Sequence, residues 1–267
     1  MCGIVAVLLY PQPRPDDVWQ ALGAVFTRAL ISNEERGQAA TGLAVIQADG
    51  LAQVYKQPIR ASQFVETPSY HDLMAKVGPT TTLILGHTRL PTRGSPSNPD
   101  NNHPIEVGPV LGVHNGHIGN DAELFERWQL PRRAEVDSEI IFQMLAAFSP
   151  QSLNGTYLSK VSECLTQMDG QFTFLALDRR CPSHLLVLKH ENPLCLHYQA
   201  EWQALIFCSR YVFLRQAFGR SVISEALPHN QLLYFDAYRL PELASHPCAV
   251  YSGLGPPSSG DSFAPKV

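Results

Sequence analysis

The sequence predicts an α+β fold in one domain, in which antiparallel sheets pack together and helices cover their outer faces. Many short apolar stretches are joined by turns rather than by long crossovers, which favours antiparallel pairing. Apolar residues at helical spacing gather in two regions, residues 16–35 and 121–168. Elements that are apolar on one face must bury that face, and packed layers do so.

The N-terminal third supplies a strand, a helix and further strands. Residues 2–10, CGIVAVLLY, form a continuous apolar run typical of a buried strand. Residues 14–35 predict a helix, because Pro15 and two acidic residues open it and apolar residues recur at helical spacing. Strands are expected at 41–47, 51–56 and 81–87. The sequence ADG predicts a hairpin turn between the first two of these strands.

The remaining two thirds begin with a loop. Residues 91–109 are rich in Pro, Asn, Gly and Ser, and the strand PVLGVHN follows them. Helices are expected at DAELFERW, DSEIIFQMLAAF and SLNGTYLSKVSECLTQM. The last third predicts the strands GQFTFLALD, HLLVLKH, LCLHYQ, ALIFCS and QLLYFDA and one helix, YVFLRQAF. We expect a single domain over residues 2–252 and a disordered Pro/Ser/Gly-rich tail over 253–267.

Composition excludes several classes of function. The chain of 267 residues is 45% hydrophobic and 16% charged, with a net charge of −4. This balance gives no basic surface for nucleic acid. No apolar run approaches the about 20 residues that a membrane helix needs. The six cysteines form no CxxC pair and no export signal precedes them, so we expect reduced thiols and a cytoplasmic protein.

Cys2, directly behind the initiator methionine, has three possible explanations: a lipid anchor, a small buried hydrophobe or a nucleophile. The lipid anchor fits poorly, because no basic leader precedes the cysteine and myristoylation would need Gly directly after Met. As a nucleophile the thiol needs a base. Removal of Met1 would supply one, namely the α-amine of Cys2 itself.

Three other short motifs each allow a structural and a functional explanation. Arg89, in LGHTRLPTRG, would either lie on the surface with an acidic partner or hold a carboxylate through its bidentate guanidinium. Asn115-Gly116, in LGVHNGHIGN, would form a tight turn or an oxyanion hole. Asp137, in EVDSEII, would cap a helix or bind an ammonium group.

Together these segments form an ordered set: an N-terminal Cys, RGQAATG, GHTRLPTRG, HNG and VDSEII. In this order the chain resembles the class II glutamine amidotransferase domain of the N-terminal nucleophile hydrolases. That domain occurs in amidophosphoribosyltransferase, glucosamine-6-phosphate synthase and asparagine synthetase B. The resemblance covers residues 2–145, and the later strands are compatible with completing the same fold. It implies a four-layer αββα sandwich of two antiparallel sheets between helix layers.

The resemblance also implies catalytic roles. Cys2 would attack the side-chain amide of L-glutamine, giving a glutamyl thioester and ammonia, and Asn115 and Gly116 would form the oxyanion hole. The sequence departs from the family pattern at Ala39 and Leu90, where many relatives carry an acidic and an aromatic residue.

Further positions are implied to bind the substrate. Arg89 would hold its α-carboxylate and Asp137 its α-ammonium group. Thr92 matches a position beside the glutamine pocket. Gly37 matches the glycine that follows a family arginine near the nucleophile.

Several of the ten histidines fall near the same motifs, namely His87, His103, His114 and His117. His114 and His117 flank the Asn-Gly pair at the end of a predicted strand, not on a helix. We therefore expect hydrogen-bonded loop or core histidines, with no metal and no cofactor.

The chain length bears on what becomes of the ammonia. About 25 residues would remain beyond the fold, too few for a synthase domain. The favoured hypothesis is therefore a glutaminase that passes ammonia to a synthase partner in trans. The alternatives are a hydrolase of another γ-glutamyl amide and a catalytically idle binding or regulatory module.

Overall fold

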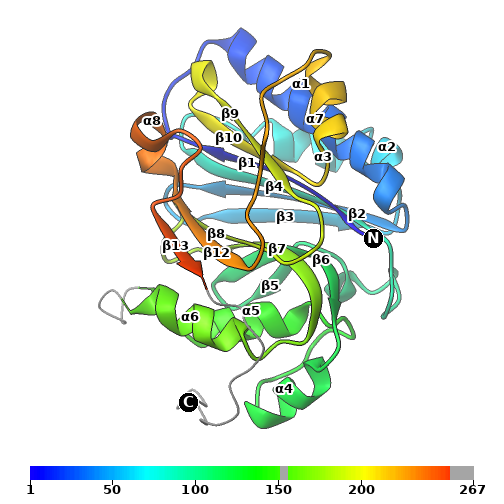
Figure 1. The fold of residues 1–267 in the computed structure, drawn as a ribbon. Coiled ribbons are helices and arrows are strands. Elements are labelled where there is room, and N and C mark those ends of the chain that lie inside the picture. The colour runs from blue at the N-terminus through cyan, green and yellow to red at the C-terminus, as the bar shows by residue number, and fades with distance from the viewer. Residues whose placement is uncertain (151–155, 253–267) are drawn as a thin grey trace.

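The strands of a computed structural model, which describes residues 1–150 and 156–252, pair into two antiparallel sheets that lie face to face (Figure 1). In the described residues the first sheet has the order β11 (Glu225–Ala226), β9 (Cys195–Gln199), β10 (Ala204–Cys208), β1 (Gly3–Leu9), β4 (Thr81–Arg89), β2 (Ala40–Gln47) and β3 (Ala52–Gln57). The second has the order β13 (Ala249–Ser252), β12 (Gln231–Asp236), β8 (His184–Lys189), β7 (Gly170–Asp178), β6 (Val110–Ile118) and β5 (Ile105–Val107).

The central strand β1 is buried on both faces, which explains its unbroken apolar sequence. Alternate side chains of a strand point to opposite faces. Val5, Val7 and Leu9 therefore join the apolar layer under the helices, while Ile4, Ala6 and Leu8 join the layer between the two sheets. The N-terminal strand is thus held from both sides, and with it the residue that precedes it.

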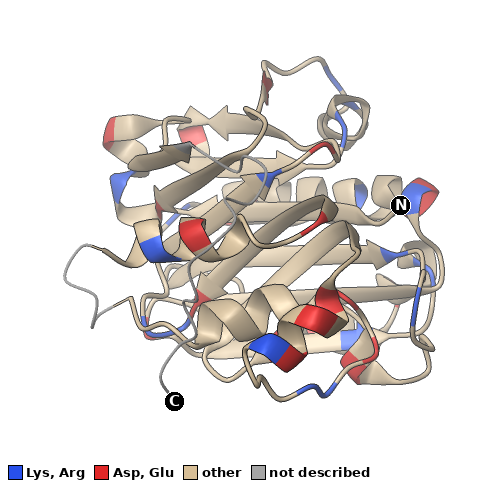
Figure 2. Ribbon diagram, turned by 60° about the horizontal axis from the view of Figure 1, so that its bottom comes forward, with Lys and Arg blue, Asp and Glu red and all other residues tan. Residues whose placement is uncertain are grey.

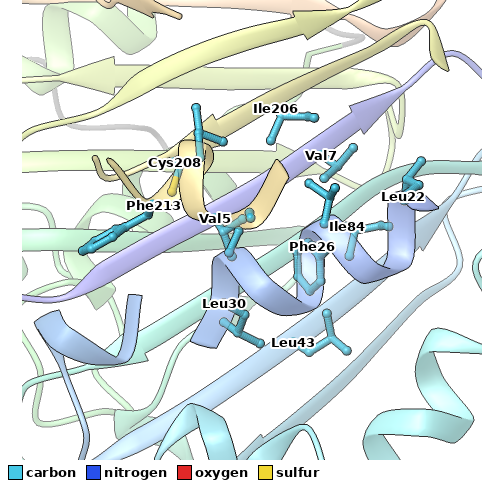
Figure 3. Close-up of a cluster of buried hydrophobic side chains, with 14 of the residues drawn as sticks. Val5, Val7, Leu22, Phe26, Leu30, Leu43, Ile84, Ile206, Cys208 and Phe213 are labelled. Atoms are coloured by element: carbon cyan, nitrogen blue, oxygen red, sulfur yellow. The ribbon is translucent and has the colours of Figure 1, made fainter. Parts of the chain in front are cut away.

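One group of helices covers the outer face of the first sheet. It comprises α1 (Asp16–Ser32), α2 (Ala61–Phe64), α3 (Pro68–Met74) and α7 (Tyr211–Phe218), with the 3-10 turn η1 (Asn33–Arg36) after α1. Figure 3 shows Leu22, Phe26 and Leu30 of α1 packed against the strands, with Phe213 of α7 beside them. This is the apolar stripe that the helical spacing predicted.

A second group covers the outer face of the other sheet and consists of α4 (Asp121–Arg127), α5 (Glu139–Ala146) and α6 (Tyr157–Leu165). Two helix layers thus enclose two sheets, and the predicted four-layer α+β architecture is confirmed (Figure 1). A short helix, α8 (Leu240–Leu243), follows β12. Acidic and basic residues are interspersed over the helices and connections (Figure 2).

Some elements differ from the expectation. Residues 91–109 contain β5 and the 3-10 turn η2 (Pro99–Asn101), so this segment is more ordered than its loop-forming composition indicates. Asn115-Gly116 forms no tight turn, because β6 continues through both residues. The predicted tail, 253–267, lies outside the described residues. Among the described residues, no helix is long and apolar enough to cross a membrane.

Candidate functional site

Residues from both sheets and from the segment before α5 meet in one pocket. Cys2 reaches it from the start of β1, Arg89 from the end of β4, Gly116 from β6 and Asp137 from the segment before α5. The lining is Cys2, Arg89, Leu90, Thr92, Arg93, His103, His114, Gly116, Val136, Asp137 and Ser138. The fold thus brings together four residues that are spread over the sequence from position 2 to position 137.

Cys2 is partly buried, and its Sγ lies 3.7 Å from the carbonyl oxygen of Leu90. Burial raises the pKa of the thiol, while the polar backbone of Leu90 and the positive charges of the N-terminus and Arg89 act in the opposite direction. The net rise means that the thiol needs a base to become a nucleophile. The carbonyl of Cys2 accepts a 2.7 Å hydrogen bond from Nε of Arg36, which holds the backbone at this position.

Arg89 is 3% exposed, so the explanation as a surface arginine is wrong. Its Nη1 donates to Oδ1 of Asn102 at 2.8 Å, and its Nη2 donates to the carbonyls of Arg93 at 2.5 Å and Gly94 at 2.8 Å. The guanidinium therefore organises the loop that carries Thr92 while it lines the pocket. A charged group held this way can meet an anion with little further loss of freedom.

Gly116 has a backbone φ of +143°, a conformation that favours glycine. A Cβ at this position would lie 1.9 Å from the carbonyl oxygen of Gln171 on β7. The preceding residue, Asn115, is completely buried, and within the described chain neither polar atom of its side chain has a hydrogen-bond partner. Asn192 donates to the carbonyls of Asn115 and Gln171, at 3.2 and 3.0 Å, and so fixes this stretch of β6.

Asp137 is buried, and its Oδ2 accepts a 2.7 Å hydrogen bond from the backbone N–H of Ile118. The residue at the N-cap of α5 is Ser138, so the explanation of Asp137 as the capping side chain is wrong. Its carboxylate is directed at β6 and the pocket instead of at the helix. Nδ1 of His117 lies 3.3 Å from the same Oδ2.

Three buried histidines lie beside the pocket, His87, His103 and His114. Burial lowers the pKa of His87 to about 3 and that of His114 to about 4, and it lowers the pKa of His103 as well. The expectation of hydrogen-bonded histidines holds for His87 and His114. Both ring nitrogens of His103 lack a partner in the described part of the chain. Among the described residues, no group of three or more His, Cys, Asp or Glu is arranged to hold a metal.

Among the described residues, those that line the pocket do not include Gly37 or Asn115. A Cβ on Gly37 would lie 2.4 Å from the carbonyl carbon of Arg89, so glycine permits close approach of the two backbones. Arg36 and Asn192 were not singled out from the sequence. Arg36 lies in the RGQAATG motif, whereas no sequence signal marks Asn192.

A family model described as a glutamine amidotransferase domain matches residues 87–216, which include Arg89, Gly116 and Asp137. The chain has a class II glutamine amidotransferase domain. The domain has two antiparallel sheets between helices, and it shares this fold with the solved structures described below.

Curated relatives of this domain include two synthases. A 7-cyano-7-deazaguanine synthase of Sulfolobus acidocaldarius is 25% identical over 78% of the chain. A glutamine–fructose-6-phosphate aminotransferase of Aquifex aeolicus is 31% identical over 73% of the chain. The chain spans 43% and 30% of the lengths of these two relatives, that is, less than half of each.

Solved structures share the fold of the domain. A glutamine phosphoribosylpyrophosphate amidotransferase of B. subtilis superposes with a TM-score of 0.65 at 16% identity, covering 88% of the chain and 47% of that protein. A glutamine aminotransferase class-II domain protein of Silicibacter pomeroyi gives a TM-score of 0.53 at 14% identity, covering 88% of the chain and 95% of that protein.

Proposed function

We propose that this amidotransferase domain cleaves the side-chain amide of L-glutamine, with Cys2 as the nucleophile after removal of Met1. The observation that carries the proposal is the common pocket of Cys2, Arg89, Gly116 and Asp137. The thiol can attack the amide carbon, and the glycine backbone can stabilise the developing oxyanion. The guanidinium suits the α-carboxylate of the substrate, and the carboxylate suits its α-ammonium group.

The first step transfers the thiol proton of Cys2 to the α-amine that loss of Met1 creates on the same residue. A separate base is required because burial raises the pKa of the thiol. The sulfur bonds to the amide carbon, the C–N bond breaks, and the α-amine returns the proton to the leaving nitrogen, which departs as ammonia. Water then hydrolyses the thioester to glutamate and the free thiol.

The negative oxygen that forms on the way needs hydrogen-bond donors. We assign this role to the side-chain amide of Asn115 and the backbone N–H of Gly116. The assignment is supported by the buried amide of Asn115, which has no hydrogen-bond partner in the described chain, and by the unusual backbone of Gly116 in the pocket wall. Donors that are already oriented cost little reorganisation during the reaction.

The α-carboxylate of glutamine is assigned to Arg89, beside Thr92, and the α-ammonium group to Asp137. Both charged residues are buried at the pocket, where a pairing with substrate is less screened than in water. We infer that the ammonia passes to a synthase in trans. Support comes from the two curated relatives, each of which extends well beyond the region that this chain matches.

Intact mass spectrometry before and after treatment with a diazomethyl ketone analogue of glutamine tests the proposal. The expected result is a starting mass that lacks one methionine, followed by a single adduct that maps to Cys2. The exposed Cys248 serves as the internal control for general thiol reactivity. A retained Met1 with no adduct, or labelling of Cys248 in place of Cys2, would contradict the proposed nucleophile.

A further inference from the structure

His117 follows the pocket residue Gly116 directly on β6 and contacts the pocket residue Asp137. Its side chain is 60% exposed, whereas that of Asp137 is 4% exposed. The Nδ1 of His117 is 3.3 Å from Oδ2 of Asp137, so an imidazole open to solvent contacts a buried carboxylate at the site. The backbone N–H of Ile118 donates to the same oxygen at 2.7 Å. The contact with His117 and the hydrogen bond from Ile118 thus use the same oxygen of Asp137, Oδ2.

The surroundings of His117 identify Asp137 as its acidic partner. On its own strand the nearby titratable group is His114, whose pKa burial lowers to about 4, so that it is uncharged near neutral pH. On the neighbouring strand β7, the residue opposite His117 is Gln171, which carries no charge. The segment before α5 contributes the carboxylate of Asp137, which contacts the imidazole of His117. The charge of the imidazole therefore acts directly on Asp137.

We propose that His117 is a specificity-determining residue that shares the Asp137 carboxylate with the α-ammonium group of the substrate. The inference rests on the proposed function, in which Asp137 receives that group. A neutral imidazole leaves the carboxylate charge available to an amide substrate with a free α-amine. A protonated imidazole is a resident cation beside the carboxylate, and it weakens the attraction for a second cation.

The pH dependence follows from this competition. Histidine side chains as a class gain positive charge as the pH falls from 7 towards 5, while a substrate ammonium group stays charged over that range. The preference for substrates with an α-amine therefore decreases as the pH falls from 7.0 to 5.5. A partly exposed charge pair of this kind predicts a change of about two- to fivefold.

The test compares the binding of two ligands to the Cys2→Ala chain, which cannot turn them over. One is L-glutamine and the other is glutaramate, which keeps the carboxylate and the amide but lacks the α-amine. Calorimetric Kd values at pH 7.0 and 5.5 give the preference for glutamine at each pH. We expect the preference to fall in Cys2→Ala and to stay constant when His117→Gln is added. His71→Gln, at an exposed position on α3, is the matched control and should retain the fall.

Each outcome decides a different point when ammonia release by the unmodified chain is measured in parallel. A preference that falls equally with His117→Gln, or that does not fall at all, overturns the role of His117 and leaves the proposed function intact. Absence of turnover with the expected binding pattern contradicts the catalytic proposal alone. Failure of both ligands to bind overturns both proposals. Circular dichroism confirms that His117→Gln is folded, as its exposed position predicts.

Discussion

The Nε2 of His87 lies 2.9 Å from the carbonyl oxygen of His114, and this contact joins the two sheets beside the pocket. His87 stands two residues before Arg89 on β4, and His114 stands directly before Asn115 on β6. A carbonyl only accepts, so we infer that Nε2 carries the ring proton. The contact thus ties the strand of the proposed carboxylate ligand to the strand of the proposed oxyanion hole.

These buried histidines predict a loss of stability in acid. Burial lowers the pKa of His87 to about 3 and of His114 to about 4, whereas an unfolded imidazole takes up a proton near pH 6.5. Unfolding therefore binds protons below pH 6.5, so this stability is complete above that pH and declines from there towards pH 4. His87 and His114 should each lower the free energy of unfolding by about 2 kcal/mol at pH 5, compared with its value well above pH 6.5. Urea unfolding at pH 7.5 and 5.0 measures the change.

The control for this prediction uses two substitutions. His114→Gln should reduce the difference in unfolding free energy between the two pH values. His71→Gln, on the exposed side of α3, should leave it unchanged. An identical pH dependence in His114→Gln and the unmodified chain would show that His114 titrates normally in the folded state.

Cys2→Ala should abolish ammonia release from glutamine while the fold is retained. The side chain is at the end of the chain and only partly buried, so removing its sulfur should change the unfolding free energy by about 1 kcal/mol or less. Ammonia release and thermal unfolding are measured on the same preparation. Cys248→Ala, at an exposed thiol, is the matched control and should be fully active. Activity in Cys2→Ala would rule out this nucleophile.

Arg89→Ala should raise KM for glutamine, because the α-carboxylate loses a buried cationic partner. The loss should be about 2–5 kcal/mol of binding free energy. The substitution also removes hydrogen bonds to Asn102, Arg93 and Gly94, so a lower unfolding temperature is expected as well. Arg215→Ala, at an exposed position on α7, controls for the loss of a positive charge. An unchanged KM would remove Arg89 from the substrate site.

Gly116→Ala should destabilise the domain by about 3 kcal/mol, through strain at φ +143° and a clash with the carbonyl of Gln171. Chemical unfolding measures the effect. Gly78→Ala is the control, since a Cβ there meets nothing within 4 Å. Equal stability of the two variants would show that β6 relaxes around the new methyl group.

The sequence by itself predicted the sheets, most of the helices and the family, because these depend on local patterns. Alternating or continuous apolar residues define strands such as β1, and helical spacing defines α1. The order of short motifs carried the resemblance. Of the two explanations for Asn-Gly, the tight turn is excluded, since its local turn preference yields here to nine residues of pairing along β6.

Only the tertiary structure decided which residues meet and in what environment. Arg89 could have been a surface charge and Asp137 a helix cap, and the burial and hydrogen-bond partners of the two side chains excluded these explanations. The contact of His117 with Asp137 joins β6 to the segment before α5. The contact of Asn192 with Asn115 joins residues far apart in the sequence, and Asn192 belongs to no recognisable motif. Such contacts depend on how two sheets and their connections pack in three dimensions, and no local pattern encodes that packing.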